Sequence, residues 1–185
     1  MKKALFIVIC GLMASAFIFI QTGCKGLLTP EEIKASIEIT DVESKWVEKL
    51  FQPWPPRLIL VPAISFRIKN ICNKPLRYMY FNAIFKFRNE RDNLGDSLVP
   101  AFQNKALLPG EVSDPILMKS NFGVEGKLLS DFKNNPSWKI AMVKLFVKLK
   151  GSQYVLLGEW EVSQKIDFKE PEPVGMKKQE EKSSL

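Results

Sequence analysis

Residues 138–166 decide the fold: they read WKIAMVKLFVKLKGSQYVLLGEWEVSQKI. Over 141–149 every second residue is apolar, and the residues between them include Lys144 and Lys148. That period of two is typical of a β-strand with one face in a core and one face in water. Gly151-Ser152 is a two-residue hairpin signal, and the chain returns as a strand over 153–166. The sequence therefore predicts an antiparallel β-hairpin here.

Five earlier segments carry the same alternation and are separated by glycine, proline and polar turn residues. Pro115 lacks the amide hydrogen that a central strand needs, so its strand is expected at a sheet edge. The alternation slips near Asp41, as it does at a β-bulge. The five expected strands are 35–47, 58–69, 77–88, 97–106 and 112–119.

Seven strands that each have one apolar face bury those faces best in two sheets packed face to face. We therefore predict an all-β fold, a single Ig-like antiparallel β-sandwich over residues 34–167. Residues 120–136 carry no regular pattern and are expected to be irregular. From Phe168 onward the chain is polar and marked by prolines, and it cannot bury enough apolar surface to offset its chain entropy. Residues 168–185 are therefore predicted to form a disordered tail.

The N-terminus has the layout of a secretory signal. The positive start Lys2-Lys3 precedes the uncharged apolar stretch 4–20. Charges of this kind hold the start of the chain on the cytoplasmic side while the apolar segment enters the membrane. Residues 1–23 are therefore predicted to be a signal peptide.

A short spacer, residues 24–33, is expected between the leader and the domain. It contains Thr29-Pro30-Glu31-Glu32. Proline is favoured at the first position of a helix, so a brief helical turn is expected to start here.

The residues before Cys24 read Gln21-Thr22-Gly23. This stretch resembles the lipobox of bacterial lipoproteins, although Gln21 stands where the family prefers an apolar residue. The resemblance implies that the Cys24 thiol receives a diacylglycerol and that the leader is cut just before it. The new amino terminus would take a fatty acid such as palmitate. Several acyl chains would make a stable membrane tether.

Two other fates of the leader stay open. A cut after Ala14-Ser15-Ala16 would release a soluble secreted protein, at the cost of exposing the apolar residues 17–20 to water. An uncut leader would remain as an anchor, because the 17 apolar residues of 4–20 reach the lower edge of a spanning helix.

The expected location is the bacterial cell envelope, with the protein held by its lipid. Lys25 follows Cys24. In proteobacterial lipoproteins an aspartate at that position tends to mean retention in the inner membrane. The resemblance therefore implies the outer membrane, with the domain facing the periplasm or the surface.

The composition argues against catalysis and against nucleic-acid binding. The chain has no histidine, the most common general base near neutral pH and the most common metal ligand. No carboxylate pair, glycine-rich phosphate loop or nucleophile elbow has the spacing that a catalytic site needs. The formal charge is +7, but the basic residues are scattered rather than gathered in a patch. We expect no enzyme activity, no metal, no cofactor and no nucleic-acid partner.

Cys72 is the one cysteine of the expected domain. Cys10 lies in the leader and Cys24 would be lipidated, so no disulfide is expected, and no zinc site can be assembled. Cys72 is expected to be a small, partly buried residue at a strand end.

Aromatic and basic side chains on loops or on the less apolar strand faces are the candidates for a binding surface. Tyrosine and tryptophan are favoured interface anchors, although they also cover sheet faces and core edges. Among them, Phe146 is an apolar contact ringed by lysines. The candidate contact residues are Phe146, Lys144, Lys148, Tyr78 and Tyr80, and Lys150, Trp54 and Trp160 belong to the same group.

The stretch from Ile64 to Glu111 resembles small envelope domains of Ig-like sandwich type, including the FxLYD-like group. The resemblance lies in ISFRIKN at 64–70, Lys74-Pro75-Leu76, the strand from Phe81 to Phe87 and Leu108-Pro109-Gly110-Glu111. These features are mostly turn chemistry, so they imply a fold more than an activity. What they imply is an exported adhesion, binding or scaffolding module.

The leading functional expectation is a membrane-tethered envelope lipoprotein whose sandwich domain binds another envelope component without catalysis. One alternative is an accessory subunit of an envelope transport or assembly complex. The other is a carrier of a soluble ligand, which would need an apolar cavity between the sheets.

Overall fold

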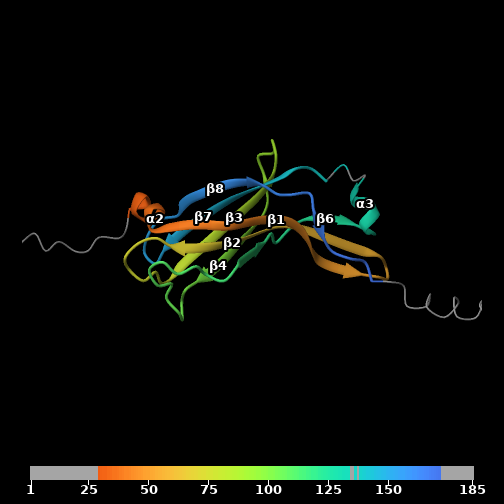
Figure 1. The fold of residues 1–185 in the computed structure, drawn as a ribbon. Coiled ribbons are helices and arrows are strands. Elements are labelled where there is room, and N and C mark those ends of the chain that lie inside the picture. Colours follow the sequence, from red (N-terminus) through yellow and green to blue (C-terminus); the bar gives the residue numbers. More distant parts are fainter. Residues whose placement is uncertain (1–28, 134–135, 137, 172–185) are drawn as a thin grey trace, which may run out of the picture.

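The computed structural model describes residues 29–133, 136 and 138–171, and Figure 1 shows their arrangement. The predicted signal peptide, the lipid-attachment residue Cys24 and most of the predicted tail lie outside these residues. Within the described part, no helix is long and apolar enough to cross a membrane.

Two facing β-sheets form the body of the domain. The first has the strand order β5-β2-β1-β9, and a further short strand, β6, also pairs with β2. The second has the order β4-β3-β7-β8. The first sheet comprises β1 (Ile37–Gln52), β2 (Arg57–Asn70), β5 (Ile116–Lys119), β6 (Val124–Gly126) and β9 (Ile166–Asp167). The second comprises β3 (Met79–Phe87), β4 (Asn93–Ala101), β7 (Ala141–Leu149) and β8 (Val155–Glu161).

The predicted all-β sandwich is confirmed, and its strand list needs corrections. The strand expected at 97–106 starts and ends earlier, as β4, and the strand expected at 112–119 is reduced to β5. The segment 120–136, expected to be irregular, contains β6 and the short helix α3 (Leu129–Lys133). The last expected strand, 153–166, is two strands, because the chain leaves the second sheet after Glu161 and crosses to the first. There β9 pairs with β1 in parallel. Ser44 holds the crossing: its hydroxyl donates to the Glu161 carbonyl and accepts from the Ser163 amide.

The core lies between the sheets and follows the period of two read from the sequence. On β3, Met79, Phe81 and Phe85 have no accessible surface, and the same holds for Leu145 on β7. Phe66 on β2 meets Phe81 edge to face, with ring centres 5.3 Å apart. Burial of these large side chains is the main favourable term in the stability of such a fold.

Helix α2 (Pro30–Ser36) confirms the expected helical turn in front of the first strand. Thr29 caps it: its hydroxyl accepts from the Glu32 amide at 3.2 Å, and the Glu32 carboxylate accepts from the Thr29 amide at 2.8 Å. This reciprocal pair is a capping box. Ile33 is 1% exposed and belongs to the core. The last residues of the expected spacer therefore pack as part of the domain.

The β1–β2 pairing confirms the expected irregularity near Asp41, because the register shifts between Thr40 and Glu43. Asp41 has φ 51°, a left-handed conformation that suits a bulge. Beyond the bulge β1 continues to Gln52, and the prolines of 53–56 form the turn into β2. The strand is longer than predicted because Phe51 and Gln52 still pair with β2.

The chain after β9 keeps contact with the domain before the described part ends. The ring of Phe168 lies 5.3 Å from that of Phe51, and the Glu170 carboxylate accepts from the Leu129 amide. The expected tail therefore begins with residues that pack, while 172–185 lie outside the described residues.

Candidate functional site

The five candidate contact residues lie on, or next to, the outer face of the β4-β3-β7-β8 sheet. On β3 the odd-numbered residues from Met79 to Phe85 point into the core, so Tyr80 points outward. On β7 the buried residues are again odd-numbered, so Lys144, Phe146 and Lys148 point outward. Tyr78 immediately precedes β3. The register of β3 with β7, two strands more than 50 residues apart in the sequence, brings these side chains to one face.

A row of three apolar side chains and one asparagine crosses the four strands at the middle of this face. Asn82 stands opposite Leu98 on one side and opposite Phe146 on the other, and Phe146 stands opposite Leu156. Directly paired residues project from the same side of a sheet, so these four side chains are neighbours. Leu98 is 58% exposed and Leu156 is 39% exposed. We call Leu98, Asn82, Phe146 and Leu156 the central row.

The amide oxygen of Asn82 is the one unsatisfied polar atom in the central row. It is shielded from solvent and, among the described residues, accepts no hydrogen bond. An acceptor left unpaired in an apolar setting weakens the domain on its own. This oxygen belongs to the residue that stands between Leu98 and Phe146 in the row.

One side of the central row carries balanced charge. Lys144 lies opposite Glu159, and its ammonium is 3.7 Å from that carboxylate. Ile84 separates this pair from Asp96 on β4. Asp96 accepts a hydrogen bond from the Asn121 amide group at 2.9 Å. This side is a polar rim with both signs of charge.

The other side of the central row is a group of rings and ammonium groups, Tyr78, Tyr80, Tyr154, Lys148 and Lys150, which we call the tyrosine–lysine cluster. Lys148 Nζ lies 4.8 Å from the ring centre of Tyr154 and 5.5 Å from that of Tyr80. Lys150 Nζ lies 5.4 Å from the ring centre of Tyr78. These are the distances of cation–π contacts. The cluster contains every tyrosine of the chain, since the sequence has three.

Tyr78 is held in a backbone conformation that a bulky residue rarely adopts. Its φ is 53°, and Phe102, which faces it after β4, has φ 55°. The Tyr78 amide donates to the Phe102 carbonyl, and the Tyr78 carbonyl accepts from the Lys150 amide. A left-handed conformation costs a non-glycine residue about 1 kcal/mol or more. Tyr78 is 40% exposed, so packing in the core does not account for its strained backbone. The strain therefore favours a role for the Tyr78 ring outside the core.

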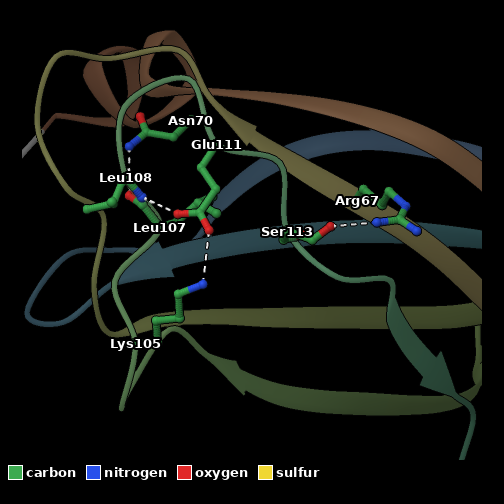
Figure 2. A network of polar contacts seen from close by, with 7 residues as sticks. All are labelled: Arg67, Asn70, Lys105, Leu107, Leu108, Glu111 and Ser113. Carbon is green, nitrogen blue, oxygen red and sulfur yellow. Dashed lines mark hydrogen bonds and ion pairs between the residues drawn. The ribbon is translucent and has the colours of Figure 1, made fainter.

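Asn70 fixes the loops at this end of the domain, and Figure 2 shows the network around it. It has no accessible surface, and its side-chain amide donates to the carbonyls of Lys74 and Leu107 at 2.8 and 2.9 Å. Its oxygen accepts from the Cys72 amide and thiol. The loop that contains Lys74 leads into Tyr78. The loop that contains Leu107 follows Phe102, so the network positions both of these strained residues.

Glu111 closes the second loop. Its carboxylate accepts from the Leu108 amide at 2.9 Å and from Lys105 at 3.1 Å (Figure 2). The pKa of Glu111 is lowered, first because the Leu108 amide stabilises the carboxylate and then because Lys105 does. Gly110 provides the positive φ of 79° that this turn needs.

The two tryptophans of the candidate group lie apart from this face. Trp160 pairs with the buried Val143 and packs against the core, so it is not an outward candidate. The reason is the register of β8, in which Glu159 and Glu161 take the wet side. Trp54 is 85% exposed at the β1–β2 turn of the other sheet.

A free thiol and a groove are the remaining features of the described residues that bear on chemistry. Cys72 is a free thiol whose sulfur lies 3.1 Å from the Asn70 oxygen and 3.2 Å from the Lys74 carbonyl. Within 29–133, 136 and 138–171, no three histidine, cysteine or acidic side chains come together in a way that could hold a metal ion. A groove of about 470 Å³ lies between the end of β4 and the segment leading into β5, with Phe102 and Pro115 among its walls.

Sequence reasoning missed Leu98, Leu156, Asn82 and Tyr154. Leu98 and Asn82 alternate with inward residues, so their outward direction could be read from the pattern. Their place in one row could not, because it depends on which strands pair. Tyr154 follows the Gly151-Ser152 hairpin closely, which could have placed it beside Lys148.

No family model matches the chain, and no curated protein matches it. A crystal structure of a Bordetella pertussis protein provisionally named ApaA is 16% identical, with a TM-score of 0.39, over 69% of this chain and 93% of that one. A Northeast Structural Genomics Consortium target is 7% identical, with a TM-score of 0.41, over 71% of this chain and 89% of that one.

Proposed function

We propose that this protein is a membrane-tethered envelope lipoprotein whose sandwich domain binds another envelope protein without catalysis. Cys24 carries the lipid, and the central row is the contact surface. The observation that carries the proposal is the central row, which has apolar side chains on three of its four strands and exposed leucines at both ends.

The layout around the central row supports a protein partner. Interfaces have an apolar middle and a polar rim, and tyrosine is enriched in them. Here the row is bordered by the Lys144–Glu159 pair on one side and by Tyr80 and Lys148 on the other. The partner would place an apolar ridge along the row and a hydrogen-bond donor near Asn82.

A soluble-ligand carrier is less well supported. That function needs an apolar cavity between the sheets. The space between the sheets is filled by large side chains such as Phe66, Phe81 and Phe85, none of which has accessible surface. An accessory subunit of an envelope complex is compatible with the proposal and would be one form of it. Kinship with the FxLYD-like group and placement in the outer membrane stay predictions.

The tether is supported by the sequence and by the position of α2. Thr29, the cap of α2, is only five positions after Cys24 in the sequence. We expect a mature chain that starts at Cys24 and carries added acyl mass, and we expect Cys24→Ala to abolish both. The measurement is the intact mass and the membrane partitioning of the natively expressed protein and the variant. An unmodified wild-type chain would contradict the tether, and its first residue would show whether the leader was cut earlier or kept.

The contact surface can be tested by photo-cross-linking in intact cells. A photoreactive residue placed at position 156 should yield one discrete protein adduct. Leu98→Asp, at the far end of the central row, should reduce that adduct about tenfold, because a charge in an apolar contact is costly to desolvate. Leu117→Asp is the matched control, since Leu117 is 46% exposed on the other sheet. Equal loss with both variants, or no adduct at position 156, would refute the proposed surface.

A further inference from the structure

We propose that the tyrosine–lysine cluster docks the domain on the anionic phospholipid surface to which the chain is tethered. The inference rests on the proposed tether and gives this end of the outer face a ligand distinct from the partner of the central row.

The cluster lies at the end of the domain where the tether enters. Tyr78 precedes β3, Lys150 follows β7 and Tyr154 precedes β8, so all three stand at one end of their sheet. Figure 1 shows α2 and the β7–β8 turn at that same end. The Ile71 amide, in the loop leading to Tyr78, donates to the carbonyl of Ser36, the last residue of α2.

The chain between the lipid and the domain is too short to let this end leave the membrane. Thr29 follows Cys24 by five positions, and an extended chain of that length spans at most about 17 Å. A group held so near a surface meets it at high effective concentration, so weak contacts suffice.

The chemistry of the cluster matches a headgroup layer. Among the described residues Lys148 and Lys150 form no ion pair with a carboxylate, so their charge is available to lipid phosphates. The rings of Tyr78, Tyr80 and Tyr154 hold these ammonium groups at the surface. Tyrosine is the residue type that settles at a membrane–water interface, and basic residues are drawn to anionic lipid.

Neighbouring side chains extend the same surface. Lys74 and Arg77 are exposed in the loop before Tyr78. Ile71 is 50% exposed in the same loop. Basic side chains, tyrosine rings and an exposed aliphatic side chain thus lie together at the end of the domain that the proposed tether holds near the lipid.

The test is a lysine-labelling footprint of the full chain, purified from its membrane and placed in lipid discs. One set of discs is neutral phosphatidylcholine, and in the other about a third of the lipid is phosphatidylglycerol. Reactivity of each lysine with an amine reagent is read by mass spectrometry, and co-elution with the discs is read by size exclusion. Lys127 and Lys169 are internal controls, because both are exposed at the opposite end of the domain.

Lys148 and Lys150 should react roughly fivefold more slowly in anionic than in neutral discs, with Lys127 and Lys169 unchanged. High salt should remove the difference. Tyr78→Gly, which suits the positive φ while removing the ring, should weaken the protection. Equal reactivity of Lys148 and Lys150 in both discs would overturn the docking and leave an acidic protein segment as the ligand of the cluster.

Co-elution separates this result from the tether. A chain that stays with both kinds of disc but shows no footprint keeps the tether and loses the docking. A chain that leaves neutral discs but stays with anionic ones loses the tether and keeps the docking. A chain that leaves both refutes both.

Discussion

Asn70→Ala should lower the free energy of unfolding by about 3 kcal/mol, a large share of the 5–15 kcal/mol typical of a domain. The side chain has no accessible surface and makes four hydrogen bonds, to Lys74, to Leu107 and twice to Cys72. Alanine would leave two carbonyls and an amide without these partners. The Leu107 carbonyl would keep the Leu76 amide as a donor, and the Lys74 carbonyl would keep the Cys72 thiol. The cost is therefore that of four hydrogen bonds lost at a fully buried asparagine, together with an unpaired Cys72 amide.

The measurement is chemical denaturation of the full chain and its variants. Asn73→Ala is the matched control, because Asn73 is exposed in the same loop. We expect the midpoint of Asn70→Ala to fall while the slope stays the same. Asn73→Ala should unfold like the wild type. Equal midpoints for the two variants would show that the network around Asn70 does not hold the loops.

The same network explains why short, separate pieces of sequence stand where they do. Lys74-Pro75-Leu76 and Leu108-Pro109-Gly110-Glu111 are more than 30 residues apart. In the fold, the Asn70 side-chain amide donates to Leu107 (Figure 2) and to Lys74. The Asn70 carbonyl accepts from the Gly110 amide. The asparagine that ends the strand ISFRIKN is the piece that connects them. Each of these two turn motifs therefore supplies one side of a tertiary contact that runs through Asn70.

The alternation of apolar and polar residues was enough to predict two packed sheets and the strand faces that form the core. It predicted the outward direction of Phe146, Lys144 and Lys148, because a strand's two faces follow from its own residues. It could not predict β9, since only two residues pair there and the pairing depends on where Ser44 directs the chain. Short strands of this kind carry too few residues to show a period.

Some members of the candidate site could be predicted from the sequence, but their arrangement could not. The lysines lie over tyrosine rings because β3 pairs with β7 in one register, with Tyr80 opposite Lys148. A shift of one residue would have sent either side chain to the core. Register between distant strands is set by the packing of the whole sandwich. For that reason the division into a central row and a tyrosine–lysine cluster emerged only from the fold.

Gly123→Ala should destabilise the domain by about 3 kcal/mol, through a clash with the backbone of β2. A β-carbon at Gly123 would lie 2.0 Å from the Leu60 carbonyl oxygen and 2.8 Å from the carbon of that group. A strand in the middle of a sheet cannot move aside, because its carbonyls are tied to both neighbours. The segment around Gly123 would have to lift off, and it carries the chain from β5 to β6, both of which pair with β2.

Gly110→Ala is the matched control, because it tests loss of glycine freedom without a clash. Gly110 has φ 79°, and nothing lies within 4 Å of its added β-carbon. Alanine there should cost only about 1 kcal/mol, the price of a left-handed conformation. The comparison, by thermal and chemical unfolding, separates close approach from backbone freedom. If Gly110→Ala proves as harmful as Gly123→Ala, contact with β2 is not what requires glycine at 123. A larger loss at 123 would show that the β5–β6 connection is pressed against the sheet and stabilises its edge.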